Sequence, residues 1–295
     1  MSDHLVRLMT RDGLLRACAA ETTALAEECR RRQQTDPTAT VALGRVATAA
    51  ALLGGQLKGE QRLALIIEGS GPLQRLQAET DAYGRVRATL KMPIANLPPR
   101  EGRFDVAAAV GHAGFLHVVK DLGLKEPYRG MVQLVTSEIG EDLAYYFATS
   151  EQTPSTVALG VELGADGAVA AAGGFLLQLL PGGDPALVDR LEQRLAELPP
   201  TTSLLRQGIA PAAILERLLG DVPTTRLGQI PLTFACTCSR KQVAGALKLI
   251  GAAELDQLLA DPGEATVTCE FCKEAYDFDG MELRAIRDSM GAPGA

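Results

Sequence analysis

Tryptophan is absent from this 295-residue chain, and aromatic residues make up only 4% of it. Any core must therefore be built mainly from Ala, Leu and Val. Hydrophobic residues account for 46% of the chain, which is enough for a core of ordinary size. The length is typical of about two domains.

Positive charge is also scarce, because 29 Lys and Arg face 36 Asp and Glu. The net charge is −7 and the isoelectric point is about 5.2. Nucleic acids and anionic membranes attract basic surfaces, so we expect neither to be a main partner.

Long apolar runs are missing as well. The first residues, MSDHLVRLMTRDG, lack the apolar stretch of a signal peptide, and we expect no stretch of about 18 apolar residues that spans a membrane. These features favour the cytoplasm, where thiols are kept reduced. Paired cysteines in that compartment indicate metal or redox chemistry more often than permanent disulfides.

Residues 1–181 carry strand and helix patterns in mixed order, without regular βαβ alternation, which predicts an α+β core domain. Apolar and alternating segments predict strands at 4–9, 14–20, 63–69, 85–91, 115–121, 130–136, 155–163 and 168–180. Helical spacing predicts helices at 22–33, at about 38–57 behind Pro37, and after Ser137 as the capping residue. In this last helix Ile139, Leu143, Tyr146 and Phe147 would share one face.

The string PGGDP at 181–185 predicts a boundary, with Asp184 as a helix cap and Pro185 in the first turn. The next helix ends at Pro199-Pro200 and has one apolar stripe, formed by Leu187, Val188, Leu191, Leu195 and Leu198. Two shorter helices are expected near 203–207 and 212–219. Residues 182–231 thus form an amphipathic linker that is too small for its own core and must lie on another surface.

Four of the six cysteines fall in residues 232–295, as Cys236-x-Cys238 and, 30 residues later, Cys269-x-x-Cys272. Four thiolates at this spacing predict a tetrahedral structural zinc site, with an iron–sulfur cluster as the alternative. Ser239 should cap a helix directly after the first pair. The histidines, His4, His112 and His117, lie outside this domain. Cys18 and Cys29 stand alone in apolar surroundings and are interpreted as core residues.

Residues 232–288 hold six Lys and Arg against ten Asp and Glu, a net charge of −4 that argues against DNA or RNA binding. So small a domain would depend on zinc for folding energy, on the order of 10–16 kcal/mol. Oxidation of the thiols would release the metal and unfold the domain, which favours redox sensing. A zinc-stabilised adaptor without a redox role is the alternative.

An enzyme is the other alternative. Gly69-Ser70-Gly71 lacks the lysine of a phosphate loop and the pattern of a nucleophile turn, so a simple turn between strands is expected. Gly173-Gly174 indicates close backbone packing in a sheet. His112 and His117 do not form a convincing catalytic pair, and we expect no enzymatic activity.

The cysteine pairs, the string CTCSR and the earlier strings YFATSEQTP and AAGGFLLQLLPG resemble the redox-regulated 33 kDa chaperonins, the heat shock protein 33 family, over essentially the whole chain. The resemblance implies an ATP-independent holdase that is inactive when reduced and bound to one zinc ion. Oxidation would form the disulfides Cys236–Cys238 and Cys269–Cys272, release zinc, and unfold the zinc domain and linker. The activated protein would form a homodimer and bind unfolding client proteins.

Overall fold

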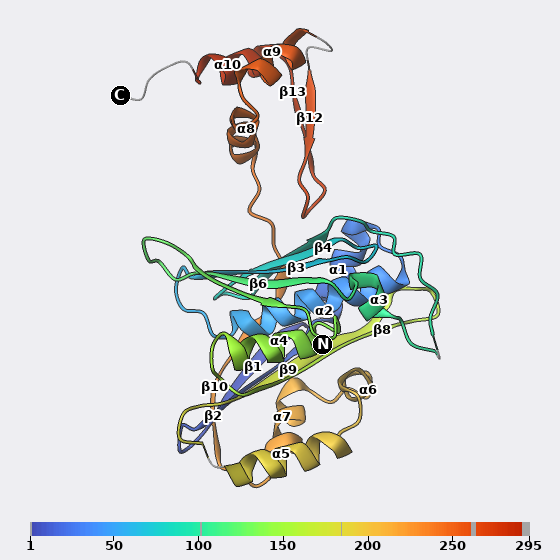
Figure 1. Ribbon diagram of the computed structural model, residues 1–295, viewed down its shortest axis with the longest axis vertical. Helices are drawn as coiled ribbons and strands as arrows, with labels where there is room; N and C mark the ends of the chain where they lie inside the picture. Colours follow the sequence, from blue (N-terminus) through green and yellow to red (C-terminus); the bar gives the residue numbers. More distant parts are fainter. Residues whose placement is uncertain (1, 101, 184, 261–263, 291–295) are drawn as a thin grey trace. The chain divides into compact units, whose positions relative to one another are not determined.

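A computed structural model describes residues 2–100, 102–183, 185–260 and 264–290 (Figure 1). The chain divides into two compact units, Met1–Ala235 and Cys236–Ala295, and each is described by itself. Strands and helices follow one another in mixed order, so the predicted α+β class is confirmed.

The first unit contains two β-sheets. The five-stranded sheet has the order β10-β1-β2-β9-β8, formed by Thr224–Pro231, His4–Thr10, Leu15–Glu21, Val169–Leu179 and Ser155–Leu163. The six-stranded sheet has the order β11-β5-β4-β3-β6-β7, formed by Thr233–Phe234, Arg85–Leu90, Arg75–Asp81, Arg62–Gly69, Gly114–Asp121 and Tyr128–Gln133. All eight predicted strands are confirmed. The segments β4, β10 and β11 were not predicted.

Two helices, α1 (Thr23–Gln33) and α2 (Pro37–Gly54), lie between the sheets (Figure 1). The Asp36 side chain caps α2 by accepting a hydrogen bond from the backbone N–H of Ala39. All of α2 except Pro37 and Arg45 is buried, and its many alanines let both sheets approach closely. An added Cβ at Gly44, for example, would lie 2.8 Å from a methyl group of Val161 on β8.

The helix α2 also corrects one expectation. By length and composition it could cross a membrane, although the sequence had been expected to hold no such stretch. Inside this protein 89% of that 18-residue window is buried, as is typical of the core helix of a globular domain.

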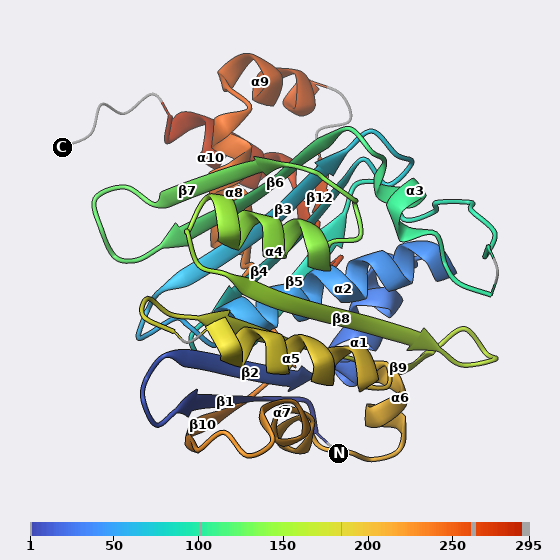
Figure 2. The same ribbon diagram turned by 60° about the horizontal axis from the view of Figure 1, so that its bottom comes forward.

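The predicted linker helices are α5 (Pro185–Glu197), α6 (Thr201–Arg206) and α7 (Pro211–Leu219), and they cover the face of the five-stranded sheet that points away from α2 (Figure 2). Their buried leucines and isoleucine pack on the outward side chains of β1, β2 and β9; the helix residues are Leu187, Leu191, Leu204, Leu205, Ile214, Leu215, Leu218 and Leu219. Leu195 and Leu198 are partly buried there, while Asp184 and the side chain of Val188 lie outside the described part of the chain. The expectation that this segment lies on another surface is confirmed.

The predicted cap at Ser137 is wrong. The helix α4 (Gly140–Thr149) begins two residues later than such a cap would place it, and the Asp142 carboxylate accepts hydrogen bonds from the backbone N–H groups of Val135, Thr136 and Ile139. Ser137 instead donates its hydroxyl hydrogen to the carbonyl of Gly111, beside the short helix α3 (Val106–Val110). The predicted apolar face of α4 is fully buried, at Ile139, Leu143, Tyr146 and Phe147.

Two glycine segments behave as expected. Gly69 ends β3, and Ser70-Gly71 begins the connection to β4; an added Cβ at Gly69 or Gly71 would lie within 2.5 Å of a carbonyl oxygen of α3. Gly173 and Gly174 lie in β9, where an added Cβ would come within 2.4 and 2.3 Å of the carbonyl oxygens of Ala20 and Ala158 on the flanking strands. Both features are therefore explained by packing.

The second unit contains α8 (Arg240–Leu249), α9 (Ala252–Ala260), α10 (Gly280–Asp288) and a hairpin of β12 (Ala265–Thr268) and β13 (Ala275–Phe278). Among its described residues the core is small, with a cluster of six buried apolar side chains: Val243, Leu247, Leu255, Phe278, Leu283 and Ile286. Ion pairs add to it: Arg240 on α8 binds Glu282 on α10, and Arg287 on α10 binds Asp256 on α9. A core of this size provides limited stability by itself.

Candidate metal centre

Cys236 and Cys238 lie in the short segment that leads into α8. The Ser239 side chain accepts a hydrogen bond from the backbone N–H of Gln242, so the predicted cap of this helix is confirmed. The cap fixes the first turn of α8, and with it the direction in which the preceding Cys-Thr-Cys segment leaves the helix.

Cys269 and Cys272 lie in the tight turn of the β12–β13 hairpin. The backbone N–H of Cys269 donates to the carbonyl of Glu274, and the N–H of Lys273 donates to the carbonyl of Cys269, both at 2.9 Å. Lys273 has a φ of 60°, the left-handed conformation that reverses the chain. This turn brings the sulfurs of Cys269 and Cys272, three positions apart in the chain, close together.

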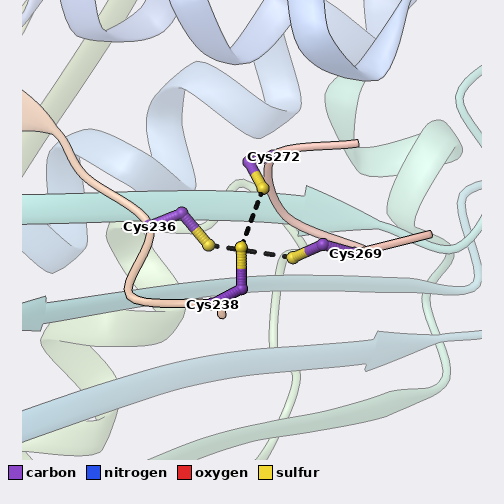
Figure 3. Close-up of side chains that lie close together, drawn as sticks. All are labelled: Cys236, Cys238, Cys269 and Cys272. Atoms are coloured by element: carbon purple, nitrogen blue, oxygen red, sulfur yellow. Dashed lines mark hydrogen bonds between the residues drawn. The ribbon is translucent and has the colours of Figure 1, made fainter. Parts of the chain in front are cut away.

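The four cysteine sulfurs converge at one point, as Figure 3 shows. Cys236 Sγ lies 3.7 Å from Cys269 Sγ, and Cys238 Sγ lies 3.2 Å from Cys272 Sγ. All four sulfurs lie within 4.8 Å of one another. The two cysteine pairs, far apart in the sequence, are thus brought together by the fold.

This arrangement fits a tetrahedral metal ion. Sulfurs held tetrahedrally at about 2.3 Å from zinc are separated by about 3.8 Å, close to the distances found here. Cys272 is only 8% exposed and the other three cysteines are partly buried, which shields such an ion from water. The donor set therefore suits a structural zinc ion, and equally the iron of a cluster.

The protonation of the thiols depends on such an ion. Burial raises the pKa of Cys272, and it raises the pKa of Cys238 as well. Without a cation these thiols would keep their protons at neutral pH. A divalent cation at the centre would lower the pKa of these thiols, because its charge stabilises the thiolate directly.

A tyrosine next to the cluster escaped the sequence reasoning. The hydroxyl oxygen of Tyr276, on β13, lies 3.2 Å from Cys238 Sγ. Only the position of Tyr276 four residues after the Cys-x-x-Cys pair could have drawn attention to it. Its contact with the sulfur depends on how α8 packs against the hairpin.

The remaining candidate residues lie elsewhere. Cys18 and Cys29 are buried in the first unit, as expected, and burial raises the pKa of each thiol to about 12. His117 on β6 lies 3.7 Å from Glu68 on β3, while no second cluster of His, Cys, Asp or Glu with metal-binding geometry occurs among the described residues.

Comparisons with known proteins agree with these observations. The family model described as "Hsp33 protein" matches residues 3–279. The 33 kDa chaperonin of Syntrophotalea carbinolica is 59% identical over 97% of this chain and 99% of its own length. The corresponding chaperonin of Geobacter sulfurreducens is 49% identical, over 99% and 97% of the two chains.

A solved structure supports the same relationship. The crystal structure of the 33 kDa chaperonin from Thermotoga maritima, described as a heat shock protein 33 homologue, superposes with a TM-score of 0.90 at 34% identity. The match covers 98% of this chain and 99% of that one. Since family model, sequences and structure agree over nearly the whole length, this chain belongs to the Hsp33 family of chaperones.

Proposed function

We propose that this chaperone is a redox-regulated, ATP-independent holdase. In its reduced state one zinc ion is held by Cys236, Cys238, Cys269 and Cys272, and the protein is inactive. Oxidation activates it, and the active form protects unfolding proteins from aggregation under oxidative stress. The convergence of the four sulfurs in a unit with a small core carries the proposal.

The first step of the switch is loss of the ligands. Two thiolates give two electrons to an oxidant and form a disulfide, which no longer binds the metal well. All sulfur pairs lie within 4.8 Å, so each is within reach after small side-chain movements. We assign the disulfides to Cys236–Cys238 and Cys269–Cys272, as the family resemblance implies.

The second step is local unfolding. Binding of zinc by thiolates stabilises small domains by about 10–16 kcal/mol. This is comparable to the contribution of the six buried side chains, at about 1.5–3 kcal/mol each, so loss of the metal would remove a large part of the stability of this unit. We propose a three-part organisation, with a core domain at 1–181, the linker at 182–231 and the zinc domain at 232–295, in which the linker loosens together with the zinc domain.

The third step is exposure of apolar surface. The linker helices cover side chains of the five-stranded sheet that include Val6, Leu8, Leu15, Phe175 and Leu177, all buried beneath them. Removal of the linker helices would expose this face. An apolar face binds unfolded proteins with little sequence preference, because its strength depends on the area buried. A homodimer of the active form would enlarge the surface.

The proposed function also concerns the location of the protein, its lack of enzymatic activity and its partners. We propose that the protein acts in the cytoplasm, is not an enzyme, and has neither nucleic acid nor membrane as a partner. The net charge of −7 supports the last two points.

An oxidant titration tests the function. Reduced, zinc-loaded protein is treated with hydrogen peroxide while zinc release, disulfide formation, hydrogen exchange and suppression of the aggregation of a heat-unfolded client are followed without ATP. We expect zinc release first, then loss of exchange protection in 182–290, then holdase activity. The mechanism is wrong if oxidised protein holds clients while these residues remain as protected as before.

A further inference from the structure

Tyr276 connects the small core of the second unit to one of the four sulfurs. Its ring is partly buried and packs against the cluster of side chains that includes Phe278 and Leu283. In the hairpin it lies opposite Val267. With the ring held in this way, the hydroxyl reaches Cys238 Sγ at 3.2 Å.

The direction of this hydrogen bond follows from the chemistry of the site. A metal-bound cysteine is a thiolate, and a thiolate has no hydrogen to donate. The Tyr276 hydroxyl must therefore donate its hydrogen to Cys238. A hydrogen bond to an ionised acceptor is stronger than one between neutral groups.

We propose that Tyr276 is a positioning residue that restrains the reaction of Cys238 with oxidants. This inference depends on the redox function proposed above. The donated hydrogen bond withdraws electron density from the sulfur and occupies one side of it. Both effects lower the nucleophilicity of the thiolate, so the threshold at which the switch responds would be set partly by a side chain that binds no metal.

The step in question is the attack of a thiolate on peroxide. Cys238 as thiolate, hydrogen peroxide and one proton give Cys238 sulfenic acid and water, so that the sulfur is oxidised by two electrons and the O–O bond breaks. The sulfur of a second thiol then attacks the sulfenic acid and forms a disulfide. The displaced hydroxide takes up the proton of that thiol and leaves as water. Tyr276 acts on the first of these reactions.

The substitution Tyr276→Phe tests the role, because it removes only the hydroxyl and keeps the packed ring. Reduced, zinc-loaded wild type and variant are treated with hydrogen peroxide. Sulfenic acids are trapped with dimedone and quantified at each cysteine by mass spectrometry. We expect initial trapping at Cys238 to rise about threefold to tenfold, with a smaller change at Cys269, because a single hydrogen bond to a charged group is lost at a partly exposed site.

The matched control is Thr266→Val. In the same hairpin the Thr266 hydroxyl donates a hydrogen bond of 2.7 Å to the carboxylate of Asp277, the residue after Tyr276. This hydrogen bond does not involve the sulfurs. If a merely looser hairpin accelerated oxidation, both variants would react faster at all four cysteines. Preferential acceleration at Cys238 in Tyr276→Phe alone would support the positioning role.

The remaining outcomes are distinct. If wild-type protein responds to peroxide and Tyr276→Phe reacts at the wild-type rate, the restraint by Tyr276 is refuted while the redox switch stands. Equal acceleration in Thr266→Val would also refute it, as would a Tyr276→Phe variant that no longer binds zinc. If the wild-type thiols resist peroxide altogether, the proposed function fails and this inference fails with it.

Discussion

The contact between α7 and the five-stranded sheet allows the role of the linker to be tested without any change at the four cysteines. Leu215 on α7 is fully buried in the cluster between the linker helices and the sheet. Truncation of a buried leucine to alanine costs about 2–5 kcal/mol, because apolar contacts are lost and a cavity remains. If the linker opens as a unit, Leu215→Ala would raise the population of its open form about thirtyfold to a few thousandfold.

We therefore expect reduced, zinc-loaded Leu215→Ala to hold clients partly without oxidant. The assay follows light scattering of a heat-unfolded client without ATP, with zinc content measured in parallel. Hydrogen exchange should show faster opening of α5, α6 and α7, while the strands of the six-stranded sheet, which pack against α2, keep their protection.

Two controls accompany this variant. Leu65→Ala removes an equally buried leucine from the cluster around α2, and Leu124→Ala removes a leucine that is 70% exposed. The first should lower stability without activating the protein, and the second should do neither. If Leu65→Ala activates as strongly as Leu215→Ala, general destabilisation explains the activity and the argument about the linker is refuted.

Three further predictions concern other parts of the chain. A strong chelator should remove one zinc ion per reduced chain and abolish exchange protection in 240–288, whereas the sheets of the first unit should keep theirs; iron in the purified protein, with visible charge-transfer absorption, would contradict the zinc assignment. Cys18 and Cys29, whose pKa values burial raises to about 12, should resist iodoacetamide at pH 8 until the protein unfolds; rapid labelling in native protein would show that their burial has been misjudged. Gly173→Ala should destabilise the first unit by about 1–3 kcal/mol in thermal unfolding, because its Cβ would lie 2.4 Å from the Ala20 carbonyl; an unchanged melting temperature would mean that the sheet adjusts freely.

The predicted strands and long helices came from strong local patterns. Segment 63–69 alternates between buried and less buried residues, and segment 168–180 is a long apolar run, and both patterns are typical of strands. Pro37 and Ser239 mark helix starts by chemistry that depends only on adjacent residues. The strand β4, RLQAETD, was missed because its outward residues are polar and only Leu76, Ala78 and Thr80 are buried. The cap at Ser137 was misplaced because Asp142, further along the chain, binds the free N–H groups instead.

By itself, the sequence determined the family, the α+β class and the identity of the four clustered cysteines. The cysteines could be identified because two pairs, each within a few residues, form a pattern typical of a four-sulfur metal site. Only the tertiary structure decided which surface the linker helices cover and which side chain contacts Cys238. Both depend on segments far apart in the chain: α7 meets strands β1 and β2 some 200 residues away, and Tyr276 reaches a sulfur 38 positions earlier. Such contacts follow from the packing of whole elements, whereas a local pattern specifies only the element to which each residue belongs.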